Sequence, residues 1–294
     1  MFVSYELFGI SSATFDPDRT FVRSSLLSPP WLAFVRLVIA IYCFTTIIVG
    51  YTWQAFNISQ IHLQDVNIPS YLMIANSVAI GRSFSFFTWL CFWSQAFYFL
   101  VSSLHTLCFA RRHHTWLHDK FPKPLQLAHN LWYTTVTTFP FLVSIVFWAI
   151  MYSGPWPTGR YEQWLNLSVH GLNSLFALIE IIIPATKRPP VSHLAVVLLI
   201  MSLYLGLAYL TKATQGFYVY EWMNPDHGKV SIVLHVLGYA GGICMIFVLV
   251  SLAFWGRVWI FSTRCAEVGN MEKGQDIWVA EMPVYKRHPE AHVV

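Results

Sequence analysis

Charge is the property that this sequence has least of. Its 294 residues include only 18 Lys and Arg and 14 Asp and Glu, so that 11% are charged, against about 25% in an average soluble domain. Hydrophobic residues make up 56% of the chain, which excludes a disordered protein because disorder requires low hydrophobicity and high charge. So few charged side chains cannot cover a soluble globule of this length. The composition therefore indicates a membrane protein.

Cysteine is also scarce, and its placement excludes a disulfide framework. Four of the five cysteines lie within apolar stretches, where no oxidised scaffold is implied. Basic residues form no patch with interleaved aromatic residues, so the net charge of +4 indicates contact with anionic lipid headgroups and no nucleic-acid partner. The first 30 residues contain Asp16 and Asp18 and lack a long apolar core. We therefore expect no cleavable signal peptide.

Long runs without any charged residue divide the chain, and they cover 37–64, 83–110, 124–159, 189–211 and 230–256. A helix needs about 20 apolar residues to cross roughly 30 Å of hydrocarbon. Tryptophan and tyrosine mark many of the ends, as in the aromatic belts at the headgroup level. We therefore predict an all-α integral membrane protein, a six-helix transmembrane bundle with spans near 31–53, 83–110, 131–153, 163–185, 191–211 and 231–261.

Lysine and arginine are divided unequally between the two sides of this bundle. The tails and the even-numbered loops together carry 13 of them, and the opposite side carries 4. Because positive residues stay cytoplasmic, both termini should be cytoplasmic. The predicted parts are a cytoplasmic N-terminal tail (1–30), a six-span domain (31–262) and a polar cytoplasmic C-terminal tail without apolar periodicity (263–294). The endoplasmic reticulum is the expected membrane, with the plasma membrane as the alternative.

Polar residues inside the spans fall on two stripes, with steps of three and four that keep one helix face inward. The stripe in the second span comprises Thr88, Cys91, Gln95, Tyr98, Ser102 and His105, and the stripe in the fourth comprises Asn166, His170, Asn173, Ala177 and Glu180. Such stripes are often hydrogen-bonding contacts between helices. We interpret Gln95, Asn166, Asn173 and Ser102 in this way. An ionisable residue within a span indicates function by default, which singles out His170 and Glu180.

The other histidines suggest less. His105, His129 and His193 lie near predicted cytoplasmic ends of spans, where an interfacial role is expected. His118 belongs to a basic cluster that begins at Arg111, which we interpret as a solvated cytoplasmic loop.

Two of the polar residues combine into possible chemistry. Thr88 lies about 8 Å and His170 about 12 Å from the same side of the bilayer, at 1.5 Å per residue. A hydroxyl beside an imidazole is the minimal pair of nucleophile and base. Glu180 lies about 15 Å further along the helix than His170, too far to orient that imidazole directly.

The spacing around these residues resembles the androgen-inducible family of multi-pass membrane hydrolases. Trp164 precedes His170 by six residues, and Glu180 follows it by ten in an Ile- and Leu-rich run. Thr88 is followed seven residues later by Gln95 and an Ala-aromatic segment. In that family the corresponding Thr and His are the essential residues.

Two further segments extend the resemblance to about residues 83–260. Phe139-Pro140 ahead of Phe147-Trp148 resembles the family's third helix, and Gly216 to Tyr220 resembles its last external loop. Two departures concern substrate choice: no second His precedes His170, and Gly171 follows it in place of a Thr.

The resemblance implies an intramembrane threonine hydrolase that cleaves fatty acid esters of hydroxy fatty acids. Thr88 would then be the nucleophile and His170 the base, with a lipid ester as substrate and membrane lipids as surroundings. The candidates for contacts to the substrate or its oxyanion are Gln95, Tyr98, Asn173 and Glu180. We expect no metal and no cofactor.

Two other interpretations remain open at this point. Glu180 and the polar stripes could line a path in a transporter, or belong to a scaffold without enzymatic activity. A transmembrane b-type cytochrome could use paired histidines, either His170 with His235 or members of the set His105, His129 and His193.

Overall fold

The computed structural model describes residues 5–10, 15–61, 76–152 and 155–280. Within these ranges every regular element is a helix, and the β-contacts are limited to an isolated bridge between Ser24 and Pro184. The chain forms two compact units, 1–254 and 255–294.

Nine α-helices are found in the described ranges: α1 (Pro29–Ile61), α2 (Asn76–Ser83), α3 (Phe87–Arg112), α4 (Trp116–Asp119), α5 (Lys123–Val146), α6 (Arg160–Leu167), α7 (Asn173–Ile182), α8 (Ser192–Gln215) and α9 (Lys229–Ala280). Two π-helical turns continue or join them, η3 (Phe147–Met151) after α5 and η4 (Ser168–Leu172) between α6 and α7. Short 3-10 turns complete the described ranges, at η1 (Tyr5–Phe8), η2 (Thr20–Val22), η5 (Glu221–Met223) and η6 (Pro225–His227).

Among the described residues, five helical stretches are long and apolar enough to cross a membrane: Pro29–Gln54, Lys123–Met151, Arg160–Ile182, Ser192–Gln215 and Lys229–Phe261. They correspond to five of the six predicted spans, and the multi-pass helical character of the chain is supported. The remaining span, predicted at 83–110, forms α3, which is long enough but less apolar. Its polar stripe lowers its hydropathy. The count of six spans and their orientation stay predictions.

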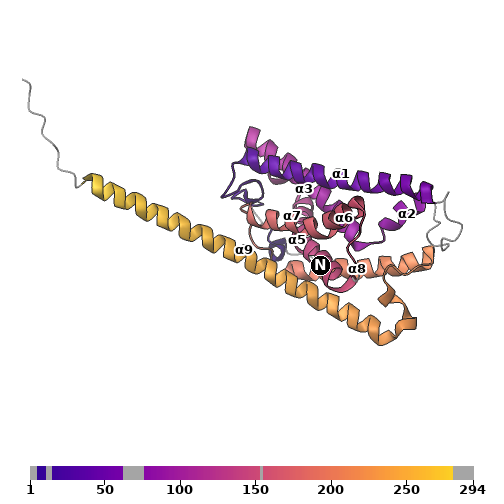
Figure 1. The fold of residues 1–294 in the computed structure, drawn as a ribbon. Coiled ribbons are helices and arrows are strands. Elements are labelled where there is room, and N and C mark those ends of the chain that lie inside the picture. The colour runs from indigo at the N-terminus through magenta and orange to yellow at the C-terminus, as the bar shows by residue number, and fades with distance from the viewer. Residues whose placement is uncertain (1–4, 11–14, 62–75, 153–154, 281–294) are drawn as a thin grey trace, which may run out of the picture. The chain divides into compact units, whose positions relative to one another are not determined.

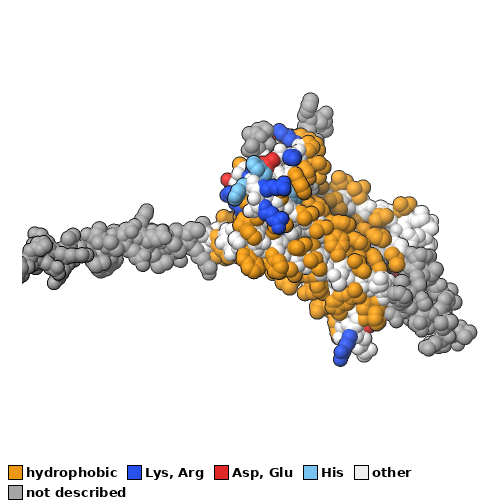
Figure 2. Space-filling model, turned by 90° about the horizontal axis from the view of Figure 1, so that it is seen from above, with side chains coloured by type: hydrophobic (Ala, Val, Ile, Leu, Met, Phe, Trp, Pro, Cys, Tyr) orange, Lys and Arg blue, Asp and Glu red, His pale blue; other side chains and the backbone are white. Residues whose placement is uncertain are grey.

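Helix α3 lies at the centre of the packing. It lies beside α1 (Figure 1) and also contacts α5 and the π-turn η4. Its inward side chains Phe92, Ala96, Tyr98 and Phe99 are buried, as are the polar residues of its stripe from Gln95 to His105. On the face that Figure 2 shows, the described residues are mainly apolar, and most of the Lys, Arg and His side chains gather at one end. An apolar outside around a core with buried polar groups suits a chain surrounded by lipid.

The predicted N-terminal tail is packed against the bundle. Ile10, Phe15, Phe21 and Val22 are buried, and the backbone of Ala185 donates a hydrogen bond to the Arg23 carbonyl. Segment 15–24 is therefore part of the folded unit.

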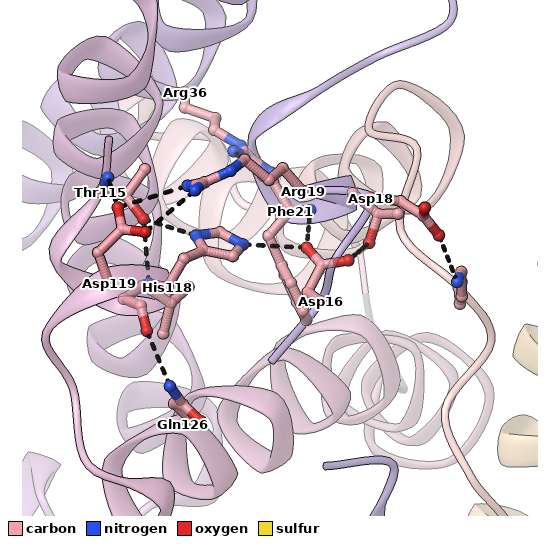
Figure 3. A network of polar contacts seen from close by, with 12 residues as sticks. Asp16, Asp18, Arg19, Phe21, Arg36, Thr115, His118, Asp119 and Gln126 are labelled. Carbon is pink, nitrogen blue, oxygen red and sulfur yellow. Dashed lines mark hydrogen bonds and ion pairs between the residues drawn. The ribbon is translucent and has the colours of Figure 1, made fainter. Parts of the chain in front are cut away.

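Charged side chains fasten this segment to the loop around α4, as Figure 3 shows. Arg19 donates to Asp119 at 3.0 Å, and the His118 Nε2 atom lies 3.1 Å from the Asp16 carboxylate. The His118 side chain is only 3% exposed, so the interpretation of this residue as part of a solvated loop is wrong. The apolar tail residues that cover the loop are the reason.

The two carboxylates in this network are stabilised in their charged form. Hydrogen bonds from Arg19 are the main cause that lowers the pKa of Asp119 to about 2. Burial alone would raise the pKa of Asp16, but hydrogen bonds from His118, Thr20 and the Phe21 amide outweigh it, so that this pKa lies below its usual value.

Helix α9 does not end where the sequence predicts the last span to end. It continues from 261 to Ala280, because no proline interrupts the chain there. Residues 255–280 belong to the second compact unit. The rest of the predicted C-terminal tail, 281–294, lies outside the described residues.

Candidate functional site

Thr88 lies in the first turn of α3, directly after a break in the helix. The predicted span begins at Ser83, but α2 ends at this residue and α3 begins at Phe87. The hydroxyl of Ser83 donates to the Ile80 carbonyl at 2.7 Å, and the hydroxyl of Ser85 accepts from Thr211 at 3.0 Å. Serine hydroxyls that bond to nearby backbone compete with helix formation, which gives the break a local cause.

The break leaves the start of α3 with free hydrogen-bonding groups. The Phe87 amide donates to the Tyr204 hydroxyl at 3.0 Å. The next amide, that of Thr88, has no acceptor among the described residues, and the Thr88 hydroxyl has no partner there either. A helix N-terminus carries partial positive charge and unpaired donors, so Thr88 presents both a hydroxyl and an N–H group at this end.

Thr88 also lines a cavity of about 150 Å³, which we call the threonine cavity. Its wall is formed mainly by apolar side chains of α3, α5, η3, α8 and α9 and of the segment around η5. The lining includes Phe87, Thr88, Phe147, Ser202, Tyr204 and Tyr220. The Tyr204 hydroxyl lies 3.2 Å from that of Tyr220, which joins the predicted last external loop to the start of α3.

His170 lies in the π-turn η4. A π-turn inserts one extra residue into a helix and is frequent at functional sites. Here the backbone carbonyl of His170 accepts hydrogen bonds from the Ser144 hydroxyl and from the Trp148 indole, the latter at 3.1 Å. Side chains of the α5–η3 helix thus satisfy a backbone group of the widened turn.

The His170 imidazole stacks flat on Phe147, with the ring centroids 3.5 Å apart and the planes within 2°. Phe147 opens the second π-turn, η3, and also lines the threonine cavity. The buried Nδ1 atom of the imidazole makes no hydrogen bond to the described residues. The two π-turns therefore meet at an imidazole beside the wall of the cavity that holds Thr88.

Two side-chain hydrogen bonds connect α3 to α7, and their order follows the chain in the same direction along both helices. The Gln95 amide donates to the Asn173 carbonyl at 2.8 Å, and further along both helices the Tyr98 hydroxyl donates to Glu180 at 2.9 Å. The π-turn η4 contacts α3 directly. The two predicted polar stripes thus face each other.

These two contacts fix the relative levels of Thr88 and His170. Measured from the first contact, Thr88 precedes it by seven residues and His170 by three, a difference of about 6 Å at 1.5 Å per residue. Measured from the second contact, both precede it by ten residues and lie level. Counted in residues from these two contacts, Thr88 and His170 therefore differ in level by at most four residues.

Gln95 and Asn173 serve the contact between the helices. Both are completely buried. The Asn173 amide donates to the Val169 carbonyl at 3.3 Å, while the side-chain oxygens of both residues have no hydrogen-bond partner. The Gln95 side chain agrees with its interpretation as an interhelical contact, whereas Asn173 meets α3 through its backbone carbonyl and its side-chain amide bonds within its own helix.

Glu180 forms a buried ion pair with Arg36 that the sequence pattern does not predict, and the Tyr98 hydroxyl donates to the same carboxylate. The Arg36 guanidinium binds both carboxylate oxygens of Glu180, and it donates to the Phe21 carbonyl at 2.8 Å and to the Thr106 hydroxyl at 2.7 Å. Arg36 is 1% exposed. The signal was present in the sequence, because Arg36 lies five residues inside the predicted first span and an ionisable residue there needs a partner.

The histidines predicted near the cytoplasmic span ends are packed within the protein. His105, His129 and His193 are buried, and the rings of His105 and His129 lie 6.0 Å apart. His235 stacks on Trp222 with centroids 5.1 Å apart. Within the described ranges, no group of three or more His, Cys, Asp and Glu residues is arranged to hold a metal ion.

Comparisons with known proteins place these residues in a family. Residues 37–258 match the model of a family described as FAR-17a/AIG1-like protein, which covers well over half of the chain and includes both α3 and η4. Neither a curated protein nor a solved structure matches the chain. The resemblance deduced from Thr88, His170 and their neighbours is confirmed, and the chain belongs to the FAR-17a/AIG1-like family, the androgen-inducible gene 1 family.

Proposed function

We propose that this protein hydrolyses lipid esters within the membrane, with Thr88 as nucleophile and His170 as base. The observation that carries the proposal is the junction at Phe147. This residue stacks on His170 and lines the same apolar cavity as Thr88. The family resemblance favours fatty acid esters of hydroxy fatty acids as substrates and the endoplasmic reticulum as the membrane.

In the proposed reaction the Thr88 Oγ atom attacks the ester carbonyl carbon, and the His170 imidazole accepts the hydroxyl proton. The C–O bond to the alcohol then breaks, and the imidazole returns the proton to the departing oxygen. Water then attacks the acyl-threonine and gives a proton to His170. The bond between the acyl carbon and Thr88 Oγ breaks, and the imidazole returns the proton to Oγ, which releases the free fatty acid and restores the Thr88 hydroxyl.

The oxyanion of this reaction needs hydrogen-bond donors near Thr88. The first turn of α3 supports such a role, since its Thr88 amide has no acceptor among the described residues and the helix dipole favours negative charge there. The sequence suggests Gln95, Tyr98 and Asn173 instead. Gln95 and Tyr98 lie about 10 and 15 Å along α3 from Thr88 and bond to α7, and the Asn173 side-chain amide bonds to the Val169 carbonyl.

A fluorophosphonate probe applied to membranes tests the proposal. Wild type should be labelled and should hydrolyse lipid esters, whereas Thr88→Ala should lose both the label and the hydrolysis. His170→Ala should lose about 10²–10⁴-fold in rate, the range for a general base. Ser202→Ala is the matched control, because Ser202 is another hydroxyl in the same cavity wall and should keep full activity. Unchanged labelling of Thr88→Ala would contradict the proposal.

A further inference from the structure

A second cavity lies between α3, α5 and α8, and we call it the lateral cavity. Its volume is about 390 Å³. An apolar cavity of about 150 Å³ takes up benzene and stays free of water, so the lateral cavity has more than twice the volume needed for a six-carbon ring. Its lining includes Cys91, Ser94, Thr135, Leu203, Tyr204 and Leu207.

The three hydroxyl groups in this lining, those of Ser94, Thr135 and Tyr204, already have partners. The Ser94 hydroxyl accepts from the Trp132 indole at 2.9 Å, and the Thr135 hydroxyl donates to the Trp132 carbonyl at 2.7 Å. The Tyr204 hydroxyl is held by the Phe87 amide and the Ser85 carbonyl. Because each of these three hydroxyl groups is already hydrogen-bonded within the protein, the wall offers water little and suits hydrocarbon.

The lateral cavity reaches the apolar outer surface of the molecule. Leu203 and Leu207 line it on α8, yet they are 64% and 37% exposed. Helix α8 is one of the stretches able to span a membrane, and only 17% of its most apolar window is buried. In a bilayer these exposed leucines face lipid, so a hydrocarbon chain has a sideways route into the cavity.

The cavity also leads to Thr88. Phe87 and Tyr204 line both the lateral cavity and the threonine cavity. Phe87 is the residue immediately before Thr88 in the first turn of α3. A chain that lies in the lateral cavity thus has its end near the residue to which the proposed function assigns the nucleophile.

We infer that the lateral cavity binds one hydrocarbon chain of the lipid ester, which enters from the bilayer past Leu203 and Leu207. The orientation of the ester carbonyl towards Thr88 rests on the proposed function. Binding of the hydrocarbon chain in the lateral cavity requires no catalysis. The rest of the ester extends past Phe87 and Tyr204, which line both cavities, into the threonine cavity.

The first test measures binding without turnover. Thr88→Ala protein in lipid vesicles is exposed to a long-chain fatty acid ester with a diazirine near the end of its chain, then irradiated and mapped by mass spectrometry. We expect labels on lining residues of α3, α5 and α8, and at least five-fold less labelling there when Leu207→Trp is added. Leu210→Trp is the matched control, since Leu210 is an exposed leucine on α8 that lines neither cavity.

The second test measures chain-length preference in the protein with Thr88 intact. Leu207→Trp should lower kcat/KM for sixteen-carbon acyl esters about ten-fold and leave four-carbon esters within two-fold. Leu203→Trp, at a more exposed position, gives a second variant if Leu207→Trp does not fold, and Leu199→Trp is its control. Equal labelling in test and control variants, or equal loss for short and long esters, would overturn the inference.

The outcomes separate this inference from the proposed function. Labelling of the lateral cavity, together with a wild-type protein that does not hydrolyse lipid esters, would support chain binding and contradict catalysis. Thr88-dependent hydrolysis without labelling of the cavity would support catalysis and overturn the inference.

Discussion

At the scale of single residues, the ion pair of Arg36 and Glu180 is the most consequential interaction in the described core. Both side chains are 2% exposed, and every partner of the guanidinium is itself buried or backbone. Taking two charges out of water is expensive, and removal of one partner of such a pair leaves an uncompensated charge. The pair therefore makes the core depend on both residues together.

Arg36→Met should lower the free energy of unfolding in detergent by about 3–5 kcal/mol, the usual cost of an orphaned buried charge. The double variant Arg36→Met with Glu180→Met should recover most of this loss, because no charge is left unpaired. Lys187→Met is the control, since its pair with Asp18 is exposed and should contribute less than about 1 kcal/mol. A double variant as unstable as the single one would contradict this account.

Much at this scale could be predicted from the sequence. The polar stripe from Gln95 to His105 and the pair Asn173 and Glu180 are buried, as the three- and four-residue steps indicate. The partners were not predictable, because periodicity tells which face is inward and not which helix it meets. Arg36 shows this limit: its place at the edge of a charge-free run resembled a boundary residue.

At the scale of elements, the two π-turns shape the candidate site. Sequence periodicity predicts a helix through 163–185 but not the widened turn within it. The extra residue at η4 depends on donors from another helix, Ser144 and Trp148, which compensate the His170 carbonyl. The break before α3 also depends in part on another helix, because the Ser85 hydroxyl accepts a hydrogen bond from Thr211 on α8.

Ser144→Ala should remove one of the two donors and loosen η4 around the imidazole. We expect kcat for lipid ester hydrolysis to fall about 10-fold, and up to about 100-fold if the ring moves by 1 Å, with KM changed less than two-fold. Ser144→Thr keeps the hydroxyl and should restore most of the rate. Loss confined to KM, or no rescue by threonine, would show that Ser144 does not position His170.

At the scale of the whole molecule, the segment 15–24 closes one end of the bundle. Its aromatic side chains are buried, and its Asp16 and Arg19 side chains pair with His118 and Asp119 of the loop around α4 (Figure 3). Short segments outside the apolar spans carry little periodicity, so the sequence indicated a tail where the structure has a packed element. Phe15, Phe21 and Val22 were the available signal.

The stabilisation from Asp119 should depend on pH in a defined direction. Its pKa is lowered to about 2 in the folded protein, against about 3.9 when unfolded. Its contribution is therefore complete above about pH 4 and disappears as the pH falls through 2. The difference in unfolding temperature between wild type and Asp119→Asn should be constant from pH 5 to 8 and should shrink between pH 4 and 2. A difference that vanishes between pH 5 and 7 would contradict the assignment of this effect to the Asp119 carboxylate.

The partners of Arg36 also set an order of assembly during synthesis. Glu180 lies 144 residues further along the chain, so at about 5–20 residues per second the ribosome reaches it roughly 7–30 s after Arg36. During that interval the newly inserted first helix carries a cation without its carboxylate, at a cost below the roughly 2.5–3.5 kcal/mol that applies at the centre of a helix, because Arg36 lies near one end of the stretch Pro29–Gln54. The placement of α1 in the bilayer thus becomes final only when the helix with Glu180 emerges and captures the guanidinium.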